Sequence, residues 1–72
     1  MEKNEVLVKI GIKIRELREA KNLSLQDLSD KCDFEKPNLI RIEKGRTNLT
    51  IGTLLKIAQV LNVRLAELVD VE

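Results

Sequence analysis

The sequence contains no histidine, tryptophan or tyrosine, and only one cysteine, one proline and one phenylalanine. A single cysteine excludes an internal disulfide, and the absence of histidine removes the usual zinc-finger ligand set. With Phe34 as the only aromatic residue, a hydrophobic core has to be built from Leu, Ile and Val. We therefore expect no metal and no cofactor, and we expect Cys32 to be a small buried hydrophobic residue rather than a redox sensor.

Long apolar runs and a large charge excess are also missing. No stretch is long enough to cross a bilayer and no signal peptide is visible, so we expect a cytoplasmic protein with no membrane partner. Charged residues make up 35% of the chain but the net charge is only +1, unlike a polycation that coats nucleic acid indiscriminately. The charge is uneven, however: residues 36–46 hold four cations against one acid.

The sequence gives little support for catalysis. There is no histidine base, no glycine-rich phosphate loop, and no serine or cysteine near a suitable base. Seventy-two residues predict one small domain, 1–72, with too little volume to enclose a substrate pocket of ordinary size. We expect neither an enzyme nor a small-molecule ligand.

Hydrophobic periodicity predicts helices and no strand. The first helix, capped by Asn4, repeats apolar residues every three or four positions. Val8 and Ile12 fall off this stripe; we expect them to widen the core face, although contact with a partner chain also remains open. The fourth helix is expected to bury Ile51, Leu54, Leu55, Ile57, Ala58 and Leu61. The predicted helices are 5–21, 25–32, 36–43, 51–61 and 64–69, which together form an all-α five-helix bundle.

The chain is organised around residues 24–45, which predict two short helices joined by a tight turn. Ser24 and Asp27 have the spacing of a capping box at the start of the first of them. This helix is expected to end near Asp33, and Glu35 can cap the next one. Gly45 then supplies a left-handed stop.

The second helix of this pair has two different faces. At about 100° per residue, Leu39 and Ile42 fall on the inner side. The outer side carries Lys36, Pro37, Ile40, Arg41 and Lys44. Three cations beside an exposed Ile40 suit the major groove of DNA, but an ordinary surface helix with a solvated basic face fits this pattern equally well.

Three segments in order carry a resemblance to a known family: IGIKIRELREAKNLSLQDLSDK, then NLIRIEKGRT, then TIGTLLKIAQVLNVRLAEL. From Ile10 to Leu68 the chain resembles the helix-turn-helix domain of the phage repressor/Cro (Xre) family. The resemblance implies a lambda repressor-like fold and binding to double-stranded DNA. It also implies that Arg18 pairs with Glu43. Three positions depart from the family's pattern: Leu25 stands for a phosphate-binding glutamine, Leu49 for a loop proline, and Arg64 for a small polar cap.

The resemblance also suggests roles in DNA binding. The residues expected at base edges are Lys36, Pro37, Asn38, Ile40 and Arg41. Arg41 is the candidate for a two-bond contact with guanine, whereas Asn38 could contact either adenine or the sugar–phosphate backbone. The residues expected at the DNA backbone are Leu25, Gln26, Lys44, Arg46, Thr47 and Asn48.

A domain of this size contacts few bases, so we expect a homodimer on a near-palindromic operator. The residues expected at the dimer interface are Leu61, Val63, Leu65, Leu68, Val69 and Val71; they could instead complete the monomer's own core. The predicted function is transcriptional regulation. In its size the chain resembles restriction–modification controllers or small phage repressors. The alternative is an antitoxin or other protein-interaction module that binds DNA only with a partner.

Overall fold

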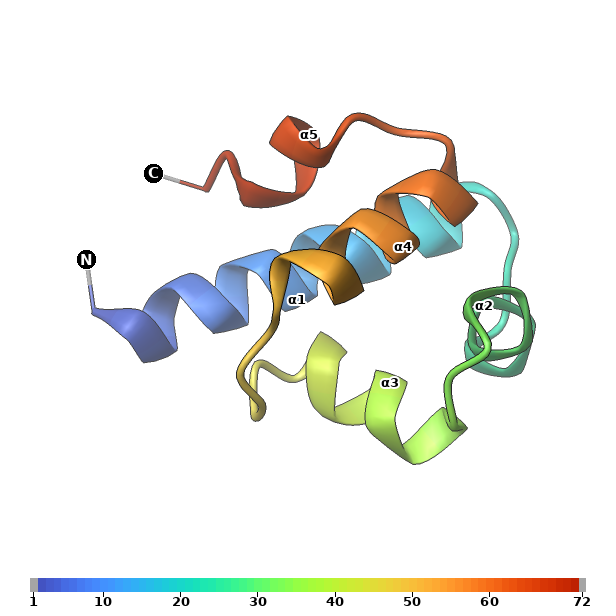
Figure 1. Ribbon diagram of the computed structural model, residues 1–72, viewed down its shortest axis with the longest axis horizontal. Helices are drawn as coiled ribbons and strands as arrows, with labels where there is room; N and C mark the ends of the chain where they lie inside the picture. Colours follow the sequence, from blue (N-terminus) through green and yellow to red (C-terminus); the bar gives the residue numbers. More distant parts are fainter. Residues whose placement is uncertain (1, 72) are drawn as a thin grey trace.

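The computed structural model describes residues 2–71, and in this range the chain forms five α-helices and no strand. The long helix α1 crosses the molecule, with α4 packed in front of it (Figure 1). The α5 helix lies along one side of this pair, and α2 and α3 lie on the other. The helices are α1 (Lys3–Ala20), α2 (Leu25–Cys32), α3 (Lys36–Glu43), α4 (Ile51–Leu61) and α5 (Leu65–Val69). The all-α five-helix prediction is therefore confirmed.

All five helices contribute aliphatic side chains to one core. Ile14 of α1, Leu28 of α2 and Leu39 of α3 are completely buried, as are residues of α4 and α5. Cys32 is also buried, as predicted, and it is a free thiol. The core consists of Ile10, Ile14, Leu28, Cys32, Leu39, Ile42, Leu54, Ile57, Ala58, Leu61 and Leu68.

Two helix starts differ from the prediction. Asn4 does not cap α1: the helix begins at Lys3, and Glu2 is the N-cap residue without a side-chain cap bond. Nothing in the local sequence stops the helix at Asn4, and the Val6 N–H donates to the Glu2 carbonyl at 3.1 Å. The α5 helix begins at Leu65, so Arg64 is its N-cap rather than its first residue.

The buried stripes of α1 and α4 are narrower than predicted. Val8 and Ile12 are 41% and 49% exposed, so the expectation that they widen the core was wrong. Two residues along a helix turn by about 200°, which places Ile12 almost opposite the buried Ile10. Ile51 and Leu55 of α4 are likewise 66% and 43% exposed, because the side of α4 that faces its neighbours holds Leu54, Ile57, Ala58 and Leu61.

Glycine allows α1 and α3 to approach each other closely. A Cβ atom on Gly11 would lie 2.6 Å from the carbonyl oxygen of Ile42 at the end of α3. Gly45, with φ of 70°, ends α3 in the left-handed conformation, and a Cβ there would lie 2.6 Å from the Val8 Cα. The backbone at the end of α3 and just after it is thus held directly against α1.

Candidate nucleic-acid interface

Local hydrogen bonds define the start of α2. The Ser24 hydroxyl accepts from the Asp27 N–H at 2.9 Å, and the Asp27 carboxylate accepts from the Ser24 N–H at 2.9 Å. This is the predicted capping box. The pKa of Asp27 lies below its usual value. The main cause is the hydrogen bond that the Ser24 N–H donates to the carboxylate, and the Ser24 side chain has a smaller effect in the same direction.

A three-residue turn then directs α3 across α2. Asp33 adopts the left-handed conformation with φ of 60°, and the Phe34 N–H donates to the Ser29 carbonyl at 2.8 Å. Glu35 occupies the N-cap position of α3, but its side chain makes no cap bond, so only its position was predicted correctly. Pro37 lies in the first turn, where its missing N–H would have had no helical partner.

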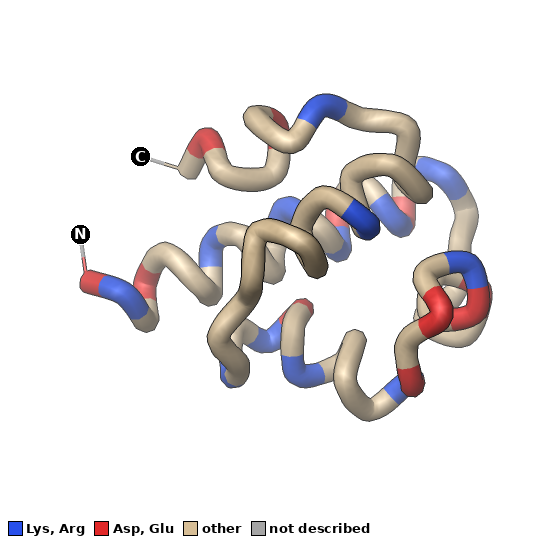
Figure 2. Tube along the Cα trace, in the orientation of Figure 1, with Lys and Arg blue, Asp and Glu red and all other residues tan. Residues whose placement is uncertain are grey.

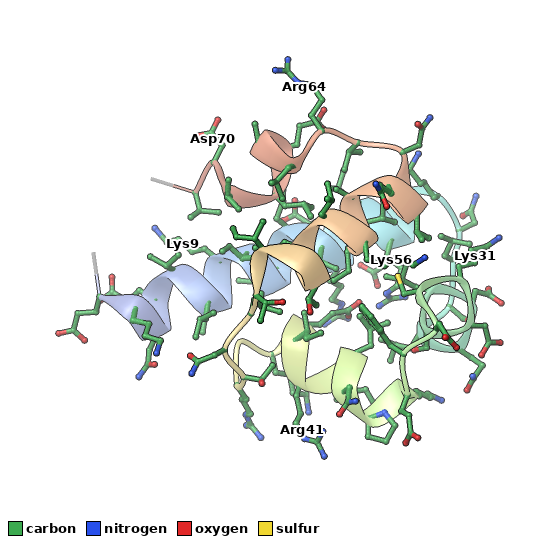
Figure 3. The ribbon with its side chains drawn as sticks, viewed as in Figure 1. Lys9, Lys31, Arg41, Lys56, Arg64 and Asp70 are labelled. Carbon is green, nitrogen blue, oxygen red and sulfur yellow. The ribbon has the colours of Figure 1, made fainter. Side chains whose placement is uncertain are left out.

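The inner and outer faces of α3 differ as predicted. Leu39 and Ile42 are buried in the core. Ile40 is half-buried rather than exposed, and it lines a hollow together with Arg15, Leu25 and Lys44. Cations follow α3 and the loop after it (Figure 2), and Arg41 projects away from the bundle (Figure 3). The exposed residues of this face are Lys36, Pro37, Asn38, Arg41 and Lys44.

A buried ion pair fixes the orientation of α3. Arg18 of α1 donates to the Glu43 carboxylate from Nε at 2.7 Å and from Nη2 at 3.1 Å. Its Nη1 donates to the Leu23 carbonyl at 2.8 Å, and the two side chains are only 9% and 7% exposed. The hydrogen bond with Glu43 raises the pKa of Arg18 above its usual value. One guanidinium therefore joins α1, the segment before α2, and the end of α3.

The positions expected at the DNA backbone lie on both sides of α3. Leu25, the first residue of α2, is half-buried, so it can offer its backbone rather than its side chain. Gln26 is exposed, but its amide already donates to Asp30 at 2.8 Å. Beyond the end of α3, the exposed residues are Lys44, Arg46 and Asn48, and Thr47 beside them is half-buried.

The expected dimer residues fall into two groups. Leu61 and Leu68 have no exposed surface, so assigning them to an interface was wrong. They point from α4 and α5 into the chain's own core. The remaining four stay available in part: Val63, Leu65 and Val71 are half-buried, and Val69 is 42% exposed.

Two contacts at this surface were not predicted from the sequence. The Leu23 carbonyl, which accepts from Arg18, has no sequence signal, because any residue supplies a carbonyl. Arg41 Nη1 donates to Asn38 Oδ1 at 2.6 Å. Their spacing of three residues on a helix was a signal that could have identified the contact.

Metal-binding groups and membrane-spanning helices are both absent from the described residues. No group of His, Cys, Asp and Glu within residues 2–71 could hold a metal ion. None of the helices in this range is both long and apolar enough to span a membrane.

Comparison with known proteins places this geometry among regulators. A helix-turn-helix family model, HTH_3, matches residues 14–68. The control protein C.BamHI of Bacillus amyloliquefaciens is 31% identical over 68 residues, covering 93% of this chain and 84% of that protein. The restriction–modification controller protein C.AhdI from Aeromonas hydrophila superposes with a TM-score of 0.83 at 35% identity, covering 86% of this chain and 94% of that chain. An HTH_3 family transcriptional regulator from Vibrio cholerae gives a TM-score of 0.87 at 28% identity, covering 93% of this chain and 38% of that chain.

Proposed function

The chain belongs to the helix-turn-helix family HTH_3, and from this premise we propose that it is a transcriptional regulator that binds a specific sequence of double-stranded DNA. The observation that carries the proposal is the outer face of α3. Lys36, Arg41 and Lys44 are exposed there, while the opposite face is fixed by core packing and by the Arg18–Glu43 pair. A rigid helix with an accessible basic face is what insertion into the major groove requires.

Base recognition is assigned to the outer face of α3. Arg41 donates two hydrogen bonds to a guanine, and Lys36 contacts guanine or a phosphate. Asn38 is exposed on the flank of this face, beside Arg41. Pro37 and the half-buried Ile40 have no polar side-chain group, so their role is contact with a thymine methyl group or exclusion of water.

Backbone contacts hold the domain in register without recognising sequence. The exposed Lys44 and Arg46 supply charge beyond the end of α3, with Thr47 and Asn48 beside them. On the other side of α3, the first backbone N–H groups of α2, at Leu25 and Gln26, approach a phosphate.

We propose that the active form is a homodimer that binds a near-palindromic operator. We expect it to act in the cytoplasm. Two half-sites one helical turn apart, about 34–36 Å, double the few contacts that one domain makes. The interface is formed by the four accessible candidates Val63, Leu65, Val69 and Val71. Since two relatives of this chain are a control protein and a restriction–modification controller, control of such a system is the narrower role we favour.

Selection from a pool of random duplexes at near-physiological salt tests the proposal. We expect a two-fold related motif with half-site centres about 10–10.5 base pairs apart. Replacing Arg41 with alanine should then relax one base position by roughly 1–3 kcal/mol.

The opposite result is uniform binding to all duplexes with an affinity that falls steeply as salt rises, because only phosphate contacts are then being made. That result would remove the regulator proposal and favour an antitoxin-like module that needs a partner protein to recognise DNA.

A further inference from the structure

Asn38 and Arg41 form a pair on the outer face of α3. Arg41 Nη1 donates to Asn38 Oδ1 at 2.6 Å, and both residues are exposed. A guanidinium has only donors, so the amide must turn its oxygen, not its nitrogen, toward Arg41. The NH₂ group of Asn38 is therefore left free for another acceptor.

This hydrogen bond controls where the arginine points. Asn38 lies one helical turn nearer the start of α3, so the bond draws the guanidinium back toward the first turns of the helix. In helix-turn-helix proteins these turns supply the contacts to base edges. An unattached arginine on the surface would sample many rotamers and would lose that freedom on binding.

The pairing leaves the positive charge of Arg41 available. Within residues 2–71 neither salt bridge involves Arg41. A carboxylate in place of the amide would also hold the guanidinium, but it would offset its charge and repel phosphate. A neutral amide orients the arginine without either effect. The two side chains also share a shallow hollow with Thr47, Asn48 and Thr53, so they lie on the same flank of α3.

We propose that Asn38 is the positioning residue for Arg41, and that the two side chains recognise one guanine as a single unit. This inference rests on the proposed function. The remaining N–H groups of Arg41 donate to guanine O6 and N7, and the free NH₂ of Asn38 donates to an acceptor beside it. Asn38 then does not recognise adenine, because that contact needs its oxygen turned to the adenine amino group and the oxygen already faces Arg41.

The test uses the operator found by selection and three duplexes that replace the guanine assigned to Arg41. That position is the one whose preference is lost in Arg41→Ala. We expect the wild type to favour guanine by roughly tenfold or more. Asn38→Ala should lower this preference several-fold although Arg41 is intact. In the absence of Arg41 the same substitution should have no further effect, so Asn38→Ala/Arg41→Ala should show the same guanine preference as Arg41→Ala alone.

Two further variants separate positioning from other roles. Asn38→Asp keeps an oxygen that accepts from Arg41, so it should retain the guanine preference while its charge weakens binding to all four duplexes. Asn48→Ala removes an amide from the same hollow that has no bond to Arg41, so it should weaken binding to all four duplexes alike. Thermal denaturation should show unchanged folding, since Asn38 is exposed.

The inference is overturned if Asn38→Ala keeps the full guanine preference, or if it instead loses an adenine preference at another base pair. Failure of the proposed function has a different signature, because selection would then yield no operator and the wild type would bind all duplexes alike.

Discussion

The buried pair of Arg18 and Glu43 determines how α3 is presented. Its guanidinium makes three hydrogen bonds, two to the Glu43 carboxylate and one to the Leu23 carbonyl. A buried ion pair adds little net stability compared with apolar residues, but removing one partner leaves an uncompensated charge. Geometry, rather than stability, is therefore the pair's main contribution to DNA binding.

Replacing Glu43 with alanine should lower the free energy of unfolding by about 3–5 kcal/mol, because Arg18 remains buried without its carboxylate. Urea denaturation measures this. The control is Glu19→Ala, which breaks the exposed Arg15–Glu19 pair, 3.5 Å apart, and should change stability by less than about 1 kcal/mol. Equal small effects from both variants would show that Arg18 and Glu43 behave as solvated surface charges.

Asp27 gives the protein a predictable response to acid. Its pKa is lowered in the folded protein from 3.8 by the bonds from Ser24. A lowered folded pKa means that the capping box stabilises the fold above the unfolded value, and that this stability is lost as the pH falls through the lowered value. Melting temperatures measured from pH 6 to pH 2 should therefore fall less steeply below about pH 4 for Asp27→Asn than for the wild type. Parallel curves for the two proteins would contradict this assignment.

At the scale of elements, the crossing of α1 and α3 depends on Gly11. In Gly11→Ala the new methyl would meet backbone oxygens of Ile42 and Glu43, which cannot move aside like a flexible side chain. We expect a loss of about 1–3 kcal/mol in the free energy of unfolding, together with weaker DNA binding because α3 is displaced.

Gly52 provides the matched control for this substitution. It is also a helical glycine, but the nearest atom to an added Cβ is 3.8 Å away. Gly52→Ala should stabilise the protein by about 0.5–1 kcal/mol, since alanine favours the helix. A neutral or stabilising Gly11→Ala would show that the helices do not need this close approach.

How far the sequence predicted these elements depended on local signals. The limits of α2, α3 and α4 coincide with the predicted ranges, because each helix has a marker at one end at least: the Ser24 capping box, Gly45, and Thr50, whose hydroxyl accepts from the Thr53 N–H at 3.1 Å. The start of α1 has no such marker and was predicted two residues too late.

Burial and side-chain orientation were harder to predict. The spacing of apolar residues shows that a helix has an inner face, but it does not show how wide that face is. For this reason Ile51, Leu55 and Ile12 were wrongly placed in the core. The candidate DNA surface followed from helical spacing and resemblance. The three-residue spacing of Asn38 and Arg41 allows a contact on a helix, but only the side-chain positions show that the hydrogen bond is made.

At the scale of the whole molecule, the candidate DNA surface and the candidate dimer surface belong to different elements. Cations follow α3 and the loop after it (Figure 2). The exposed Val69 lies on α5. The surfaces proposed for DNA and for a second copy of the chain therefore share no residue.

Val69→Glu should shift the protein from dimer to monomer, because a charge at an apolar interface must be desolvated without a partner. Analytical ultracentrifugation over a range of concentrations measures the shift. Ile12→Glu introduces the same charge at another exposed aliphatic residue, on α1, and should leave the dimer intact. A wild type that stays monomeric both free and on its operator would remove the dimer from the account.

We propose that the outer face of α3 lies in the major groove, and DNA cleavage from a tethered iron chelate can locate it there. Cys32 is buried, and burial raises the pKa of its thiol, so an introduced surface cysteine is modified first. The chelate is attached to Pro37→Cys on α3 and, as a control, to Ala66→Cys on α5. We expect the first derivative to cut the operator at two symmetric sites about 10–10.5 base pairs apart and the second not to cut it. Cleavage from Ala66→Cys alone, or scattered cleavage from both, would contradict it.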